Sequence, residues 1–296
     1  MGADVIAWNA LPEQVRDTVQ GHVGLVTTAT DVTAGQNSDI SAVLQRQDAA
    51  PVFLKGVHGV SPRMRWLRNE TATAPLTRGL SPAVLFSEDV DGWLIVGFEH
   101  VTGRPASLAP GSPDLPIVAH AVNRIGTLPG AGLRPLRQRW AVTDWWRKLA
   151  TETPDVIAGW DVDEAMAWAA RFPALADGDR LVHTDLHGDQ FLIRECTARV
   201  IDWGYPGAGA AWVDTAFVVL RLVEAGHAPG DAETWACNNL ACFAGGEHLT
   251  AFVVHIAGLW GYWAVTGNIP GAQHRAQLAR DYAAWRLAAT PTSASH

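Results

Sequence analysis

The chain has 296 residues, of which 48% are hydrophobic and 18% are charged, and its formal net charge is −8. This composition is that of a folded globular chain rather than a disordered one, and the length allows one large domain or two smaller ones. The negative charge argues against a nucleic-acid binder and mildly favours a cationic partner.

Cysteine usage and the N-terminus predict a reduced, cytoplasmic setting. Cys196, Cys237 and Cys242 are an odd count without a metal-ligand spacing, and the first residues lack a basic region followed by an apolar core. The longest apolar run, 251–265, is short for a membrane span and contains His255, so we expect a buried core helix and no membrane partner.

The first hundred residues are predicted to form mainly β-structure with two helices. Pro12 at a first helical position opens one helix, and Ser61 before Pro62 caps the second. Asp91-Gly92 is a strong hairpin signal between the last two strands. The predicted strands are 23–29, 41–46, 52–57, 83–86 and 93–98.

Lys55 stands in the third of these strands among apolar neighbours. The period of two puts it on the side of Phe53 and Val57, although lysine is seldom found there unless it is paired. The chain uses arginine twenty times but lysine only twice, at Lys55 and Lys148, so a lysine here indicates a specific role. The structural alternative is a charged residue that protects an edge strand.

Glu70 lies on or beside the apolar face of the following helix, one turn after Leu67. A carboxylate there needs a partner, and Lys55 on the preceding strand is the natural one. The alternative is an ordinary solvated glutamate.

From Pro105 onward the pattern predicts helices. Asp161 and Glu164 form a capping box at the start of one of them, and the fourteen tryptophans are read as core residues. Residues 290–296 are expected to be disordered. The predicted helices are 115–128, 140–149, 162–172, 216–223, 233–244, 249–265 and 272–287.

The most informative stretch is 181–204, which reads as a tight hairpin of two short buried strands with polar residues at both ends. His183, Asp185 and Gln190 come before the first strand, and Asp202 follows the second. Folding the hairpin brings an acid and an amide from one side next to an acid from the other, which is how a divalent cation is held over a phosphate.

A metal-hydrolase site is the competing interpretation of this stretch. His183, Asp185 and His187 alternate and could point one way from a strand. No other cluster in the sequence supplies the missing ligands, and Lys55 and Glu70 would then have no explanation.

The pattern of His-x-Asp, a hairpin and Asp202-Trp203-Gly204 resembles the aminoglycoside phosphotransferase family, which shares the protein-kinase-like fold. His183, Asp185 and the Asp-Trp-Gly turn match that family in type and order, whereas Gln190 stands where the family usually has asparagine. The resemblance implies an α+β bilobal fold, with a small antiparallel-β lobe carrying one key helix and a larger helical lobe. The implied limits are 1–97 for the nucleotide-binding lobe, 98–103 for a hinge and 104–289 for the catalytic and substrate lobe.

The resemblance also implies how ATP or GTP would be bound. Lys55, held by Glu70, would contact the phosphates, and amides around Gly35 and the Ser38 hydroxyl would cover them. Asp202 and Gln190 would bind Mg²⁺. The hinge backbone would hydrogen-bond the purine through the residues Phe98, Glu99, His100 and Val101.

The implied reaction is transfer of the γ-phosphoryl group to a hydroxyl of a small molecule. Asp185 would accept or orient the hydroxyl proton, His183 would brace the catalytic loop, and Asp214 would support that loop from behind or simply cap its helix. An aminoglycoside-like or other cationic antibiotic is the first candidate substrate, and choline-like alcohols, macrolides, cationic peptides and homoserine remain open.

Gln190 also keeps a second interpretation open. Its amide oxygen can ligate Mg²⁺, but the side chain is one methylene longer than asparagine, and Mg²⁺ demands near-ideal octahedral geometry. We expect an active enzyme, and the alternative is a nucleotide-binding pseudo-enzyme without phosphoryl transfer.

Overall fold

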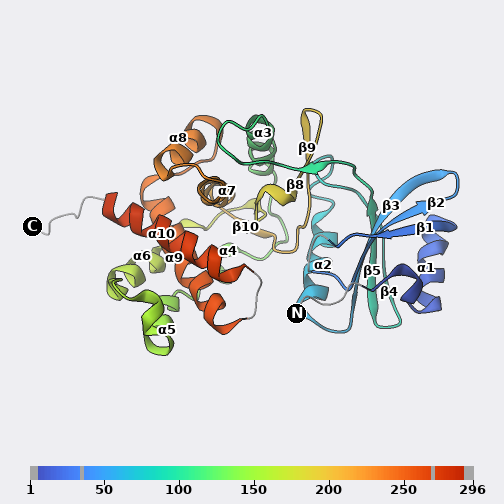
Figure 1. Ribbon diagram of the computed structural model, residues 1–296, viewed down its shortest axis with the longest axis horizontal. Coiled ribbons are helices and arrows are strands. Elements are labelled where there is room, and N and C mark those ends of the chain that lie inside the picture. The colour runs from blue at the N-terminus through green and yellow to red at the C-terminus, as the bar shows by residue number, and fades with distance from the viewer. Residues whose placement is uncertain (1–5, 34–36, 268–270, 290–296) are drawn as a thin grey trace, which may run out of the picture. The chain divides into compact units, whose positions relative to one another are not determined.

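The computed structural model describes residues 6–33, 37–267 and 271–289 (Figure 1). The chain forms two compact units, and each of them is built from two separate segments. The first unit combines Met1–Ala106 with Asp189–Pro206, and the second combines Ser107–Gly188 with Gly207–His296. The limits 1–97, 98–103 and 104–289 stay a prediction, and the tail 290–296 lies outside the described residues.

The first unit is built on an antiparallel sheet with the strand order β1-β2-β3-β5-β4. The five strands predicted from the sequence are present with shifted ends. Their bounds are β1 Val26–Asp31, β2 Ile40–Arg46, β3 Ala49–His58, β4 Val84–Val90 and β5 Trp93–Glu99. At the β4–β5 turn, Asp91 and Gly92 both have positive φ angles, of 49° and 75°, as a tight hairpin of this type requires.

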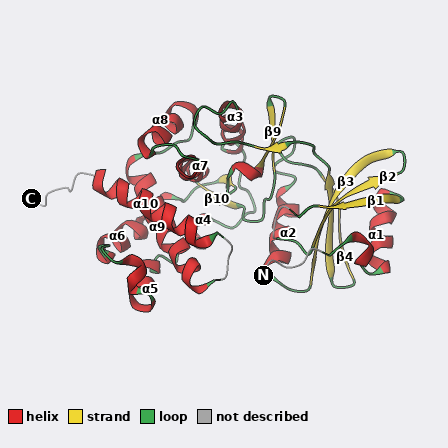
Figure 2. Ribbon diagram, viewed as in Figure 1, coloured by secondary structure: helices red, strands yellow, loops and turns green. Residues whose placement is uncertain are grey.

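Helices α1 (Glu13–Val23) and α2 (Pro62–Thr73) cover opposite faces of this sheet (Figure 2). Val52 and Leu54 of β3 pack in the core on the α1 side, whereas Phe53 and Val57 pack on the α2 side. This alternation follows from the period of two along a strand. It sends Lys55 toward α2.

The two helix starts differ in how well the sequence predicts them. Ser61 caps α2 as expected, because its hydroxyl accepts a hydrogen bond from the Met64 amide at 3.2 Å. Pro12 does not occupy the first helical position. Its backbone is extended, with ψ of 145°, and its carbonyl accepts from the Val15 and Arg16 amides, so α1 begins at Glu13.

The first unit also contains a small sheet in the order β6-β8-β9, with bounds Arg104–Pro105, Phe191–Arg194 and Thr197–Val200. Strands β8 and β9 are the predicted central hairpin, in which Phe191 pairs with Val200. Short 3₁₀ turns span Trp8–Ala10 and Gly188–Gln190.

The second unit is mainly helical, with a two-stranded sheet of β7 (Arg180–Val182) and β10 (Gly207–Gly209). Helix α9 packs against α5, α6 and α10. A 3₁₀ turn spans Pro154–Ile157. The helices are α3 Leu115–Ile125, α4 Leu136–Arg139, α5 Trp145–Glu152, α6 Val162–Leu175, α7 Trp212–Glu224, α8 Pro229–Asn239, α9 Gly246–Thr266 and α10 Ala272–Ala289.

The predicted helices of this unit are present with shifted ends, and two of them are displaced along the chain. The stretch 140–149 is helical only from Trp145, because Trp140 ends α4 and its ring packs against Phe172 and Phe217 instead of continuing a helix. The stretch predicted as 233–244 begins earlier, at Pro229, which stands at a first helical position, and it ends at Asn239.

Helix α9 is the one helix in the described ranges that is long and apolar enough to cross a membrane by length and composition. Within its most apolar stretch, 72% of the residues are buried inside the protein. Its burial is therefore that of a core helix, as predicted for residues 251–265. The α+β class, with a small antiparallel-β part and a larger helical part, is likewise confirmed.

Candidate active site

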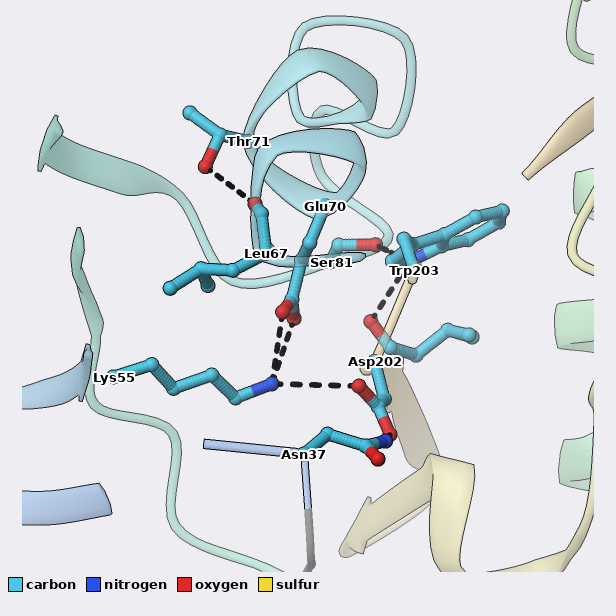
Figure 3. A network of polar contacts seen from close by, with 9 residues as sticks. Asn37, Lys55, Leu67, Glu70, Thr71, Ser81, Asp202 and Trp203 are labelled. Carbon is cyan, nitrogen blue, oxygen red and sulfur yellow. Dashed lines mark hydrogen bonds and ion pairs between the residues drawn. The ribbon is translucent and has the colours of Figure 1, made fainter. Parts of the chain in front are cut away.

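Lys55 and Glu70 form the ion pair that the sequence predicts (Figure 3). The Lys55 Nζ atom lies 2.8 Å from Oε2 and 3.1 Å from Oε1 of Glu70, so the contact is bidentate. The same Nζ atom lies 3.5 Å from Oδ1 of Asp202 and 5.7 Å from the centre of the Phe98 ring. One ammonium group thus joins the sheet, helix α2 and the turn after β9.

The electrostatics of this network keep Lys55 charged. Burial alone would lower the pKa of Lys55, but the carboxylates of Glu70 and Asp202 outweigh it and raise that pKa above its usual range. Burial raises the pKa of Glu70, and Lys55 opposes this shift. A cation kept charged among apolar neighbours is suited to bind an anionic ligand.

The turn that carries Asp202 is anchored to the rest of the first unit. The Trp203 indole nitrogen donates to Ser81 Oγ at 2.8 Å, and the side-chain Nδ2 of Asn69 donates to the Gly204 carbonyl at 2.9 Å. Asp202 has a φ of 66°, a left-handed conformation that is unfavourable for a residue with a side chain. Such strain persists where surrounding contacts hold it and is typical of functional turns.

Asn37 belongs to this network, although sequence reasoning did not select it. Its Nδ2 atom lies 3.5 Å from Oδ2 of Asp202, whereas the Lys55 ion pair is with Oδ1 (Figure 3). Next to it, Asp39 accepts from the His58 amide at 2.8 Å and pairs with Arg63 at 2.7 Å, so the end of the loop is tied down. The signal in the sequence was the run of polar residues 37–39 before β2.

Of the two residues predicted in this loop, Ser38 is half-buried beside Asn37, and Gly35 lies outside the described residues. The role of either residue in covering phosphates stays a prediction.

Gln190 is buried at the start of the central hairpin, where its backbone carbonyl accepts a hydrogen bond from the Ile201 amide at 3.0 Å. The hairpin therefore brings the backbone of Gln190 next to the residue that precedes Asp202. Carboxylate and amide oxygens are hard donors that suit Mg²⁺, which is often held by one or two protein ligands and substrate phosphates. The donor set thus fits this ion, and its binding stays a prediction.

The predicted hinge residues divide into two pairs. Phe98 pairs with Phe53 and Val84 in the sheet, and the Glu99 amide already donates to the Ala83 carbonyl at 2.8 Å. His100 and Val101 come after the end of β5. Backbone contacts to a purine are therefore better expected from these last two residues.

In the second unit, Asp214 holds the predicted catalytic loop. Its carboxylate oxygens accept the backbone amides of His183 and Thr184, each at 2.8 Å. The Arg139 guanidinium donates to the Thr184 hydroxyl. Burial raises the pKa of Asp214 to about 7, although both amides and Arg139 oppose the shift. The predicted support from behind the loop is confirmed, and the capping alternative is wrong because Ala211 stands at the cap position of α7.

Asp185 follows directly on the segment that Asp214 holds, and its side chain is 38% exposed. Its carboxylate lies 3.7 Å from the guanidinium of Arg221, a residue that sequence reasoning missed. His183 is fully buried. Within the ranges that the structure describes, no three His, Cys, Asp or Glu residues form a group that could hold a metal ion, so the hydrolase interpretation gains no support.

The comparisons with known proteins point to small-molecule kinases. No family model matches the chain. Thiamine kinase from Salmonella paratyphi A is 27% identical over 203 residues, which span 62% of this chain and 66%, just under two thirds, of that relative.

Solved structures of small-molecule kinases match almost the whole chain, and two of them are an aminoglycoside phosphotransferase and a choline kinase. The aminoglycoside phosphotransferase APH(4)-Ia, a thermostable mutant in a ternary complex with AMP-PNP and hygromycin B, gives a TM-score of 0.66 at 14% identity and covers 95% of this chain and 100% of that one. Choline kinase LicA from Streptococcus pneumoniae gives a TM-score of 0.66 at 13% identity, and the match covers 92% of this chain and 98% of that one.

The chain therefore has the protein-kinase-like fold that these small-molecule kinases share. Its resemblance to the aminoglycoside phosphotransferases, which residues 183–204 indicate, is confirmed at the level of the fold.

Proposed function

We propose that this protein is a kinase that transfers the γ-phosphoryl group of ATP or GTP to a hydroxyl of a small molecule. The observation that carries the proposal is the network of Lys55, Glu70 and Asp202, because a lysine fixed by a helix glutamate beside a metal-binding acid is the arrangement that positions nucleotide phosphates. The fold and the likeness to thiamine kinase support the same class.

The described residues can share the work of phosphoryl transfer as follows. Lys55 contacts the phosphates, and Asp202 and Gln190 would hold Mg²⁺, which neutralises phosphate charge when bound. Asp185 takes the proton of the acceptor hydroxyl. The hydroxyl oxygen forms a bond to the γ-phosphorus while the bond between the γ-phosphorus and the β–γ bridging oxygen breaks. Asp214 keeps the backbone before Asp185 in place through the two amides that it accepts.

We propose a small cationic alcohol as the acceptor. The net charge of −8 favours a cation, and thiamine and aminoglycosides are both cationic compounds with hydroxyl groups. An aminoglycoside-like antibiotic and a thiamine- or choline-like alcohol are the two classes to separate. A kinase that uses ATP works where ATP is abundant, so the proposal includes a cytoplasmic location.

The test is a screen with γ-labelled ATP and GTP against aminoglycosides, thiamine, choline and homoserine, repeated with Asp185→Ala. We expect label transfer to at least one acceptor and a loss of about 10²- to 10⁴-fold in the variant, with its fold intact. Asp179→Asn, which changes a carboxylate that is 92% exposed in the same unit, is the matched control. Full activity of Asp185→Ala would remove the assigned role.

A nucleotide-binding protein without phosphoryl transfer is the second candidate. It is favoured by Gln190 in place of asparagine and by Asp202, whose two carboxylate oxygens contact Lys55 and Asn37. A rise in melting temperature with ATP and Mg²⁺, together with no label transfer to any acceptor, would support this candidate over the kinase.

A further inference from the structure

Arg221 lies on the same face of α7 as Asp214. The two residues are seven positions apart, close to two full turns of an α-helix, so their side chains leave the helix in nearly the same direction. Asp214 holds the amides of His183 and Thr184, and Arg221 lies beside the carboxylate of Asp185. One helix face thus contacts three consecutive residues of the predicted catalytic loop.

The guanidinium of Arg221 is itself held in place. Its Nη1 atom lies 2.8 Å from Oε2 of Glu224, one turn further along α7, and the group stacks 5.3 Å from the centre of the Trp260 ring. The Arg221 side chain is only 5% exposed. A cation fixed from two sides can direct a carboxylate that is more exposed than itself.

The distance between the two charges is informative. Arg221 Nη2 and Asp185 Oδ1 are 3.7 Å apart, beyond the range of a full hydrogen bond but within that of a strong charge interaction. Arg221 can therefore orient the carboxylate without occupying an oxygen as a hydrogen-bond donor. Asp185 keeps its acceptor capacity for a hydroxyl of the substrate.

Arg286 offers a comparison with a buried arginine that has a structural role. Its guanidinium donates to Glu233, Thr250 and the Gly246 carbonyl, so it joins three groups of the helical core. Arg221 differs, because its buried Nε atom has no hydrogen-bond partner among the described residues. A purely structural arginine is expected to have its donors satisfied.

We propose that Arg221 is a positioning residue for Asp185, held by Glu224 and Trp260, and that it sets the orientation of the carboxylate that receives the hydroxyl proton. This inference rests on the proposed kinase function. It predicts that Arg221 acts on turnover rather than on nucleotide binding, since Lys55 and Asp202 belong to the other unit.

The test compares Arg221→Met, Arg221→Lys and Glu224→Gln with the unchanged protein. Arg171→Met is the matched control, because Arg171 also pairs with a glutamate, Glu247 at 3.3 Å, and stacks on a tryptophan, Trp168 at 4.4 Å. For each variant, kcat, KM for ATP and the melting-temperature shift with ATP and Mg²⁺ are measured. Guanidinium ion is then added to the Met variant.

We expect Arg221→Met to lower kcat on the order of 10- to 100-fold while KM for ATP and the nucleotide-induced shift stay unchanged. The kcat of Arg221→Lys should lie between those of Arg221→Met and the unchanged protein, and Glu224→Gln should lose less of its kcat than Arg221→Met. Added guanidinium should restore part of the rate that Arg221→Met has lost. If Arg221→Met does not fold, Arg221→Lys and Glu224→Gln provide the same test.

Unchanged kcat in the folded variants would overturn the positioning role while leaving the kinase proposal standing. An equal loss in kcat and in nucleotide binding would assign Arg221 a structural role instead. If the unchanged protein transfers phosphate to no acceptor, the kinase proposal fails, and this inference fails with it.

Discussion

His255 is a buried titratable group whose effect on stability can be worked out from its surroundings. It lies in the middle of α9, fully buried, with its ring 4.9 Å from that of Phe172 and 6.4 Å from that of Trp140. Neither ring nitrogen has a hydrogen-bond partner within the described residues. Burial lowers the pKa of His255 to about 3.

The sign of the pH effect follows from linkage. In the unfolded chain a histidine binds its proton below about pH 6.5, whereas in the folded protein His255 stays neutral, so protons favour the unfolded state. The contribution of His255 to stability is therefore complete above this pH and is lost as the pH falls from there toward the folded pKa of about 3. The loss is about 1.4 kcal/mol per pH unit, or about 2 kcal/mol at pH 5.

The substitution His255→Leu removes this titration. We expect the free energy of unfolding of the variant, relative to the unchanged protein, to rise by about 2 kcal/mol between about pH 7.5 and about pH 5. The measurement is urea unfolding followed by tryptophan fluorescence at both values. His120→Gln, a change at an exposed histidine of α3, is the control and should show no such rise. A difference between Leu variant and unchanged protein that is the same at both pH values would refute the reasoning.

Two further predictions concern the candidate site. Lys55→Met should lower the free energy of unfolding in urea by about 3–5 kcal/mol, because it leaves the buried Glu70 carboxylate without its ion-pair partner. Adding Glu70→Leu should recover part of that loss. A double variant that is less stable than Lys55→Met would contradict this reasoning. Gln190→Ala should raise the Mg²⁺ concentration for half-maximal turnover by about tenfold or more, whereas Gln190→Asn should not. An unchanged requirement in the Ala variant would show that Gln190 is not a ligand.

Local patterns in the sequence were sufficient for one half of the candidate site. The period of two in β3 and the helical period in α2 place Lys55 and Glu70 on facing surfaces. The two residues are only fifteen positions apart in the chain, so their contact could be predicted from the sequence. The hairpin that carries Asp202 was predictable for the same reason, because it is a local structure with its own turn.

The other half depends on contacts between distant segments. Arg221 lies in an apolar helix where nothing in the local pattern links it to Asp185, and Asn37 approaches Asp202 across 165 positions of the chain. The prediction that a helix begins at Trp140 was wrong for a similar reason. The ring of that residue is fixed by Phe172 and Phe217, and this packing outweighs the local preference for a helix.

The first unit is made of two separate segments of the chain, and this limits how the protein can be shortened or recombined with a relative. A fragment ending at Ala106 would keep β6 but lack β8 and β9, the neighbouring strands of the same small sheet, which arrive only with residues 189–206. Grafting the first unit of a relative onto this protein therefore requires two separate insertions made together. Recombination at a single point would break that sheet, so the two segments should be inherited as a pair.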